Sequence, residues 1–286
     1  MKVLISGASG FVGTALIEAL RARGHAVRSI SRRPGAEHDW STESLSRGVE
    51  WADAVVNLAG ENLFARRWDP VFKQELWRSR FEGTKALATL VGKRPGTVLV
   101  SASAIGIYGD RGEEELGEDA APGRGFLPEL ARDWEEATRP AEQGGARVVI
   151  LRIGIVLGHG GALARMKTPF RLGLGGRLGT GRQWMSWIAL DDLVALILHA
   201  LEQPAARGVY NATAPQPCTN AEFTRTLAGV LRRPALFPVP AFALRLALGE
   251  AAQVLLEGQR VLPRRALAEG FVFQEPGLER CLRRLL

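Results

Sequence analysis

The chain has 286 residues, of which 46% are hydrophobic and 23% are charged, a balance that is typical of globular proteins and excludes wholesale disorder. No apolar run approaches the ~18 residues of a membrane-spanning helix. The two cysteines, Cys218 and Cys281, have neither metal-ligand spacing nor a disulfide framework, so we expect a cytoplasmic, reducing location and no metal site. The length predicts one large domain, or a domain with an attached lobe.

The net charge is +7, from 37 Lys and Arg against 30 Asp and Glu. Nucleic-acid binding requires cations that gather into a patch or stripe. Here the doubled arginines are isolated along the chain: Arg32-Arg33, Arg66-Arg67, Arg232-Arg233, Arg264-Arg265 and Arg283-Arg284. We therefore expect a small-molecule ligand, with neither a nucleic-acid nor a membrane partner.

The first residues predict a strand, a glycine turn and a helix. Residues 3–5 are an apolar run typical of a strand buried on both faces, and residues 11–22 have helical periodicity. Glycines between such elements let the backbone approach a pyrophosphate, which the helix N-terminus binds through free N–H groups and its positive dipole end. A tight turn without a ligand is the alternative. The residues expected to bind a dinucleotide are Gly7, Ser9, Gly10, Phe11, Val12 and Gly13.

The end of the second strand, residues 26–30, indicates which dinucleotide binds. NAD sites usually place an acidic side chain here for the ribose 2′-OH, whereas NADP sites use a cation for the 2′-phosphate. This chain has Ser31 and Arg32 instead of an acid, followed by Arg33, which either helps or faces solvent. We therefore expect NADP as the cofactor; a solvated basic turn is the alternative.

The next segment supplies further candidates for the cofactor site. Trp40 either edges the adenine pocket or packs against the fold. Residues 54–56 predict another buried strand, and Leu58, Ala59 and Gly60 follow its carboxyl end. Doubly wound sheets bind ligands at that edge.

The order of the motifs resembles that of the extended short-chain dehydrogenases/reductases. The landmarks are Gly7-x-x-Gly10-x-x-Gly13, Asn57-Leu-Ala-Gly60, Ser101-Ala-Ser103 to Tyr108-Gly-Asp110, Leu151-Arg152 to Gly158, and Trp187-Ile-Ala-Leu-Asp-Asp192. More narrowly, three stretches resemble an uncharacterised "epimerase family" group with an added C-terminal segment: Asn57–Asn62, Pro169–Gly176 with Gly179 and Gly181, and Leu256–Arg260 with Pro263.

The resemblance implies an α/β fold, a Rossmann-type doubly wound parallel sheet with a smaller C-terminal substrate lobe. Residues 1–160 would form the NADP-binding domain, to which later strands return. Residues 161–286 would form the substrate lobe and a C-terminal helical extension.

The resemblance also implies further contacts to the cofactor. Arg80 would reach its ribose or phosphate side with support from Glu75, five residues earlier and close to one helical face; a surface ion pair is the alternative. Ser101 would lie beside the cofactor, and Val156 would pack near the nicotinamide ring.

The Tyr-x-x-x-Lys pair that exchanges protons in this superfamily is absent. A free phenol, with a pKa near ~10, is a poor base at neutral pH, which is why a neighbouring Lys is required. The two tyrosines, Tyr108 and Tyr210, are followed four residues later by Gly112 and Ala214, and residues 126–130 place Phe and Leu in the expected position. The standard mechanism is therefore in doubt.

Two hydroxyl groups remain as candidate catalytic residues. Ser103 follows the apolar residues 98–100 and either hydrogen-bonds a substrate oxygen or satisfies the backbone. Tyr108 is either a substitute proton donor or a packing residue. For Asp133 and Glu135 we expect a solvated helix face rather than a catalytic base.

Polar residues predict two helix starts in the second half. Asp191 is expected to cap the helix that extends to Leu201. Thr219, with Glu222 three residues later, predicts a capping box at the start of another helix.

The second half also contains a loop, residues 171–182, that is rich in glycine and arginine and suits either a lid for an anionic substrate or a connector. The apolar segment 242–256 is expected to bury on the main domain or at a homodimer interface. Together these features predict an NADP-dependent oxidoreductase or nucleotide-sugar-epimerase-like enzyme for a small polar substrate. The alternative is a catalytically silent NADP-binding sensor or scaffold.

Overall fold

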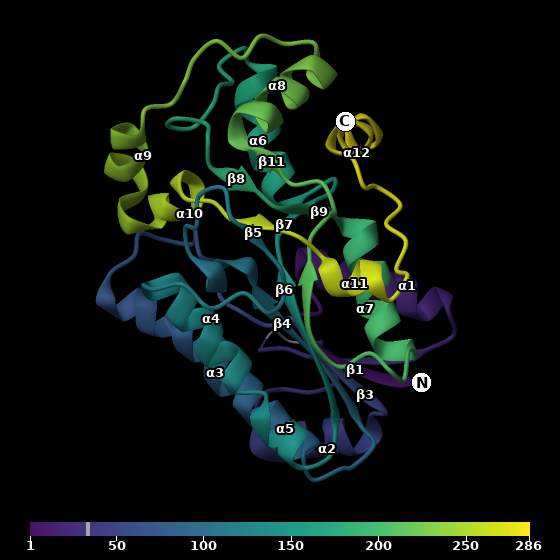
Figure 1. Ribbon diagram of the computed structural model, residues 1–286. Helices are drawn as coiled ribbons and strands as arrows, with labels where there is room; N and C mark the ends of the chain where they lie inside the picture. The colour runs from purple at the N-terminus through teal and green to yellow at the C-terminus, as the bar shows by residue number, and fades with distance from the viewer. Residues whose placement is uncertain (33–34) are drawn as a thin grey trace.

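The computed structural model describes residues 1–32 and 35–286. At its centre lies a parallel six-stranded sheet with the strand order β10-β6-β4-β3-β1-β2 (Figure 1). The chain leaves β1 toward β2 and returns to the other side of β1 to form β3, so a topological switch point lies between β1 and β3. The strands are β1 (Lys2–Ser6), β2 (Ala26–Ile30), β3 (Ala54–Asn57), β4 (Val98–Ala104), β6 (Arg147–Ile153) and β10 (Gly208–Ala212).

Helices cover both faces of the sheet, and alternate strand residues supply the two cores. Val3, Ile5 and Val56 pack toward the first layer, and Leu4 and Val55 pack toward the second. The first layer holds α1 (Phe11–Ala22), α7 (Leu190–Glu202) and α11 (Arg264–Ala268), and the second holds α2 (Thr42–Trp51), α3 (Pro70–Val91) and α5 (Arg139–Gln143), with α4 (Phe126–Glu136) beside α3. The predicted doubly wound parallel sheet is thus confirmed.

A smaller lobe lies beyond the carboxyl ends of the strands (Figure 1). Its core is built around Trp187, Phe223 and Leu282, together with both cysteines, which are free and buried. The lobe and its connections contain η1 (Ile105–Tyr108), β5 (Glu115–Leu116), β7 (Ile155–Leu157), α6 (Gly161–Arg171), β8 (Trp184–Met185), β9 (Trp187–Ala189), β11 (Cys218–Thr219), α8 (Asn220–Leu231), α9 (Ala241–Leu248), η2 (Gly249–Ala252), α10 (Gln253–Leu256), β12 (Arg260–Val261) and α12 (Leu278–Leu285). No helix in the described ranges combines the length and apolarity that crossing a bilayer requires.

The two predicted helix starts have different outcomes. Thr219 and Glu222 form the predicted capping box of α8. The cap predicted at Asp191 is wrong, because α7 begins at Leu190 with Ala189 as its N-cap.

Asp191 and Asp192 instead hold the C-terminal segment against the main domain. The buried Asp192 carboxylate accepts hydrogen bonds from the backbone N–H groups of Gln274, at 2.7 Å, and Glu275, at 3.0 Å. Asp191 pairs with Arg284 at 2.5 Å near the surface. Burial raises the pKa of Asp192, although the two backbone hydrogen bonds act in the opposite direction. The end of the chain is therefore an integral part of the fold.

The segment around α9 is packed differently. None of its residues is buried, and Phe242 and Leu246 expose most of their side-chain surface. Of the two expectations for segment 242–256, burial against the rest of the fold applies to its second part, where Ala251 and Ala252 are buried, while α9 leaves an apolar face uncovered.

We expect Asp192→Ala to lower the free energy of unfolding by about 2–5 kcal/mol, because the buried N–H group of Glu275 and the partly buried one of Gln274 lose a charged acceptor. The exposed ion pair between Asp191 and Arg284 provides a matched control. Asp191→Ala should change the free energy of unfolding by less than about 1 kcal/mol. Chemical denaturation measures both values. Equal losses would show that Asp192 does not anchor the segment.

Candidate functional site

The turn between β1 and α1 depends on glycines for two different reasons. Gly7 has φ +73°, and a Cβ there would lie 2.7 Å from the carbonyl carbon and oxygen of Leu58. A Cβ at Gly13 would lie 2.3 Å from the Gly7 oxygen. At Gly10 a Cβ would meet this same oxygen at 3.1 Å and no other described neighbour within 4 Å. Gly7 and Gly13 thus permit close packing, whereas Gly10 leaves open space beside the turn.

The start of α1 is open to an anion. Ser9 and the N-cap residue Gly10 are exposed, the cap makes no side-chain hydrogen bond, and the first turn contains no acid. The first N–H groups of a helix have no partner within it, and the dipole there favours negative charge. This turn can therefore bind a phosphate group.

Phe11 and Val12 are held by packing. The Phe11 ring lies against Gly158 and Gly161, where added Cβ atoms would approach it to 2.7 and 2.9 Å. Val12 packs against the core between the sheet and α7. Their backbone N–H groups, rather than their side chains, are available to a ligand at the helix start.

The end of β2 places a cation beside the switch point. The Arg32 side chain is 78% exposed, and its Nη2 lies 3.9 Å from Oε2 of Glu61, in the segment after β3. The Ser31 N–H donates to the carbonyl oxygen of His38 at 3.0 Å. Arg33, which was expected to help or to face solvent, lies outside the described residues.

A buried polar row lies beneath the turn, on the face covered by α3 and α4. Ser6 and Asn57 are register partners on β1 and β3, and the Ser6 hydroxyl donates to Asn57 Oδ1 at 2.5 Å. Asn57 Nδ2 donates to Thr84 Oγ1 at 2.7 Å, and Trp134 Nε1 donates to the same oxygen at 2.9 Å. The row ties the carboxyl ends of β1 and β3 to both helices. Motif reading identified Asn57 as a landmark but assigned it no role.

Arg80 supports the segment that follows β3. Its Nη2 donates to the carbonyl oxygen of Glu61 at 2.9 Å, its guanidinium lies 5.2 Å from the ring centre of Trp134, and burial lowers its pKa to about 10. Arg80 also lies beside Gly60, where an added Cβ would be 3.3 Å from Arg80 Cζ. It thereby positions the expected cofactor loop Leu58–Gly60.

The structure does not bring Glu75 to Arg80. The Glu75 carboxylate pairs with Arg66 at 2.6 Å. Residues five apart on an α-helix point about 140° away from each other, and only residues three or four apart are neighbours on its surface. The expectation that Glu75 supports Arg80 is therefore corrected.

Three other predicted cofactor residues have packed environments. Trp40 lies over Gly83 of α3, where an added Cβ would meet its ring at 3.1 Å. Ser101 is fully buried, and its hydroxyl donates to the Ala102 carbonyl oxygen at 3.3 Å, so it offers no exposed surface to a cofactor. Val156, on β7, is half-buried against the core between the sheet and α7.

Ser103 belongs to a buried ionic network. It is the register partner of Arg152 across β4 and β6, and its hydroxyl donates to Glu135 Oε1 at 2.7 Å. Arg152 binds both oxygens of this carboxylate, at 2.8 and 2.9 Å. Burial alone lowers the pKa of Arg152, but Glu135 outweighs this effect and the pKa is raised. The expected solvated position of Glu135 is wrong, whereas Asp133 accepts a hydrogen bond from Trp77 Nε1 at 2.8 Å and is partly exposed.

Tyr108 lies in the same network and faces inward. Its hydroxyl donates to Asn211 Oδ1 at 2.7 Å and accepts from Arg152 Nη1 at 2.8 Å. The side chain is fully buried, and burial raises its pKa, although Arg152 opposes this shift. The structure therefore places Tyr108 in a packed, structural position.

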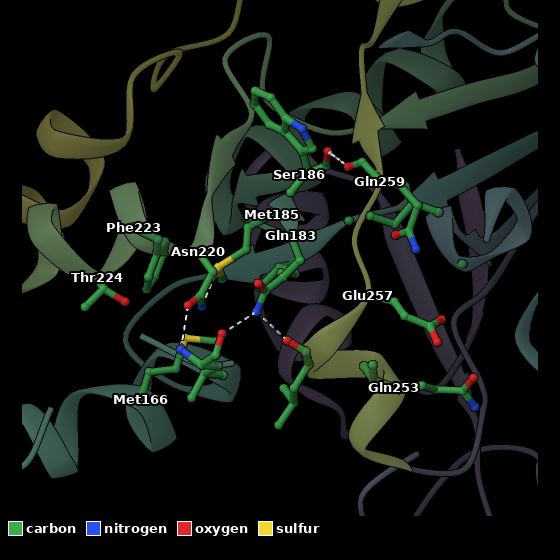
Figure 2. A pocket seen from close by; sticks show the side chains of 18 of the residues that line it. Met166, Gln183, Met185, Ser186, Asn220, Phe223, Thr224, Gln253, Glu257 and Gln259 are labelled. Atoms are coloured by element: carbon green, nitrogen blue, oxygen red, sulfur yellow. Dashed lines mark hydrogen bonds between the residues drawn. The ribbon is translucent and has the colours of Figure 1, made fainter. Parts of the chain in front are cut away.

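A cavity of about 350 Å³ opens where β4 and β6 end, and Figure 2 shows part of its lining. Ala104 follows Ser103 directly and lines the cavity, as does Gly154 beyond β6. The exposed arginines of the 171–182 loop, Arg171, Arg177 and Arg182, are not among the lining residues. Within the described chain, no group of three or more His, Cys, Asp or Glu side chains could hold a metal ion.

Comparisons with known proteins agree with this geometry. A family model described as "NAD dependent epimerase/dehydratase family" matches residues 3–213, and a "Domain of unknown function (DUF1731)" matches residues 239–285. The chain is 45% identical over 279 residues to "Epimerase family protein Mb2239" of Mycobacterium bovis, with 95% of this chain and 93% of the relative covered.

Solved structures show the same relationship. The crystal structure of human epimerase family protein SDR39U1 (isoform 2) with NADPH has a TM-score of 0.94 and 40% identity, and covers 100% of this chain and 99% of that one. A Thermus thermophilus UDP-glucose 4-epimerase complex with NAD has a TM-score of 0.77 at 19% identity, covers 100% and 97% of the two chains, and shows the shared fold alone. The chain thus belongs to the NAD dependent epimerase/dehydratase family of extended short-chain dehydrogenases/reductases, in the group of "epimerase family" proteins with the added C-terminal domain.

Proposed function

We propose that this protein is an NADPH-dependent oxidoreductase that holds its cofactor along the β1–α1 turn and a small molecule in the adjacent cavity. The observation that carries the proposal is the uncapped start of α1, with open space at Gly10, beside the switch point of the sheet. Doubly wound sheets bind dinucleotides at this place. The human relative, which is 40% identical, was crystallised with NADPH.

Arg32 supports the choice of NADPH over NADH. Its guanidinium is mostly exposed at the end of β2 and is engaged only by the long contact to Glu61 among its charged described neighbours. A planar guanidinium binds phosphate oxygens through charge-assisted hydrogen bonds. The ribose 2′-phosphate would therefore have a partner there, with Ser31 nearby.

When bound, NADPH supplies a hydride, and the residues at the end of β4 can move the accompanying proton. Ser103 is buried and lies one residue before the cavity-lining Ala104. Its hydroxyl donates to Glu135, so its oxygen keeps the capacity to accept a hydrogen bond from a substrate hydroxyl that reaches it. In the oxidation of a hydroxyl, the hydride would pass to NADP⁺ while Ser103 took the hydroxyl proton and passed its own proton to the Glu135 carboxylate. In the reduction of a carbonyl, the hydride would come from NADPH, and the same proton would return from Glu135 through Ser103 to the substrate oxygen. Arg152 fixes the orientation of Glu135. Tyr108 orients Arg152 and has no proton-transfer role in this proposal.

A second function, a cofactor-loaded sensor without turnover, is favoured by the missing Tyr–Lys pair and the inward position of Tyr108. The two functions share the cofactor site and differ in catalysis. Tight NADPH binding without oxidation across a broad panel of carbonyl compounds would favour the sensor.

Gly10→Asp should weaken NADPH binding roughly a hundredfold, because a carboxylate would face the pyrophosphate. The melting temperature should stay the same or rise, since Asp is a favourable N-cap. Calorimetric titration and thermal unfolding measure the two effects. Gly277→Asp makes the same change at the uncapped start of α12 and should leave NADPH affinity unchanged; unaltered affinity in Gly10→Asp would refute the proposed phosphate site.

Arg32→Ala should raise the Kd for NADPH by about 10- to 100-fold, the value of a charge-assisted hydrogen bond. The Kd for NADH should change little, because NADH lacks the 2′-phosphate. Arg47→Ala removes another exposed, ion-paired arginine and serves as the control in the same titration. An equal effect on both cofactors would mean that Arg32 does not read the 2′-phosphate.

Ser103→Ala should leave NADPH affinity unchanged and lower kcat by about 100-fold or more, the usual contribution of a positioned acid or base. NADPH oxidation with a carbonyl substrate from the panel measures kcat. The control is Ser46→Ala, which removes a surface Ser–Glu hydrogen bond in α2. Full activity of Ser103→Ala would remove this residue from the mechanism.

A further inference from the structure

The C-terminal segment builds one wall of the cavity. Val239, Gln253, Val254, Leu255, Glu257 and Gln259 line it, and all lie within the stretch matched by the domain of unknown function. Figure 2 shows Gln253, Glu257 and Gln259 on one side and Met166, Phe223 and Thr224 on the other. The cavity therefore has two sides of different chemistry.

One side is formed mainly by apolar side chains of α6, α8 and the segment after α6. Met166, Phe170, Leu174 and Phe223 are among them. Of the described lining residues, none is Lys, Arg or His, and Glu257 is the one acid. This wall favours hydrocarbon over a charged group.

Several polar groups between the two sides are already occupied by the protein. Gln183 Nε2 donates to the carbonyl oxygens of Leu178 and Leu255, at 3.0 and 2.9 Å. Asn220 Oδ1 accepts from the Leu178 N–H at 2.8 Å. These contacts hold the loops in place, and they leave fewer polar atoms for a ligand.

The side formed by Gln253, Glu257 and Gln259 has polar side-chain groups that no other described residue engages. In the described part of the chain, no hydrogen bond engages the side chains of Gln253, Glu257 or Gln259. Glu257 is an exposed residue; partial desolvation and the nearby Asp110 carboxylate raise its pKa, while Arg245 opposes the shift. These two amides and one carboxyl group can bind a single hydrogen-bonding end of a ligand.

We propose that the substrate is an uncharged, largely apolar carbonyl or hydroxyl compound, whose polar end binds to Gln253, Glu257 and Gln259. This inference rests on the proposed function and names the substrate class of the same site. It replaces the small polar substrate expected from the sequence. It also assigns a role to the C-terminal domain, which selects the substrate through the wall that it contributes.

A diphosphate-linked substrate fits this cavity poorly. Burying phosphate charges without a cationic partner is strongly unfavourable. The lining offers no such partner among its described residues, and Glu257 would repel the anion. The arginines of the 171–182 loop are exposed outside the cavity.

The test compares three probes by calorimetric titration of the full chain without cofactor: 1-octanol, octanoate and UDP-glucose. We expect octanol to bind, octanoate to bind at least about tenfold more weakly, and UDP-glucose to give no detectable binding. Glu257→Gln should narrow the difference between the octanol and octanoate affinities without abolishing it, because the repulsion from Glu257 is lost while the carboxylate still lacks a cationic partner. Binding of UDP-glucose, or octanoate binding as tightly as octanol to the wild type, would overturn the proposal.

A matched pair of variants locates the octanol. Met166→Arg places a cation in the cavity and should abolish octanol binding, whereas Leu246→Arg changes an exposed residue of α9 outside the lining and should not. Equal losses would assign octanol to the exposed surface and overturn the proposal. Because no cofactor is present, octanol binding by a protein that fails to bind NADPH would refute the proposed function alone.

Discussion

The site depends on a buried polar row at the carboxyl ends of the central strands. Ser6, Asn57 and Ser101 are in register across β1, β3 and β4, and Ser103, Arg152 and Asn211 are in register across β4, β6 and β10. Buried polar groups are stable only where hydrogen bonds satisfy them. Ser6 is hydrogen-bonded to Asn57. Ser103 and Arg152 share Glu135, and Tyr108 joins Arg152 to Asn211. Asn57 and Thr84 thereby fix the strand ends against which Gly7 packs. These strand ends hold the turn that leads into the uncapped start of α1.

The second half of this row is bound to Glu135, on the same helix, α4, that has Phe126 and Leu130 where the standard proton-exchanging pair is expected. A buried ion pair such as Glu135–Arg152 adds little stability of its own, because desolvation opposes the attraction. It does fix a geometry, since removing either partner would leave an uncompensated buried charge. Arg152 also binds the Tyr108 hydroxyl and the carbonyl oxygen of Glu118. The network therefore holds Ser103 in one orientation directly before the cavity-lining Ala104.

Sequence reasoning was most successful where a local pattern determines a local structure. The apolar runs predicted the buried strands, and Thr219 with Glu222 predicted a cap because both partners lie within one helical turn. Glu75 and Arg80 show the limit of such reasoning. They are five residues apart on α3, and only residues three or four apart are neighbours on a helix surface. Glu135 shows a second limit: its partner Arg152 lies on another strand, and only the register of β4 and β6 brings Ser103 to both. The polar residues that follow the apolar runs, such as Ser6 after residues 3–5 and Asn57 after residues 54–56, were the sequence signal for this buried row.

The cavity was harder to predict because its walls come from distant parts of the chain. Ala104 and Gly154 follow strands of the shared fold, whereas Gln253 and Glu257 come from the C-terminal domain. Asp192 links the two parts by holding the backbone at Gln274 and Glu275. The parallel sheet determines where a dinucleotide binds, but the charge of the cavity lining depends on the added segment. Membership of the family thus identifies the cofactor more directly than the substrate, and the substrate class has to be argued from the wall that this chain adds.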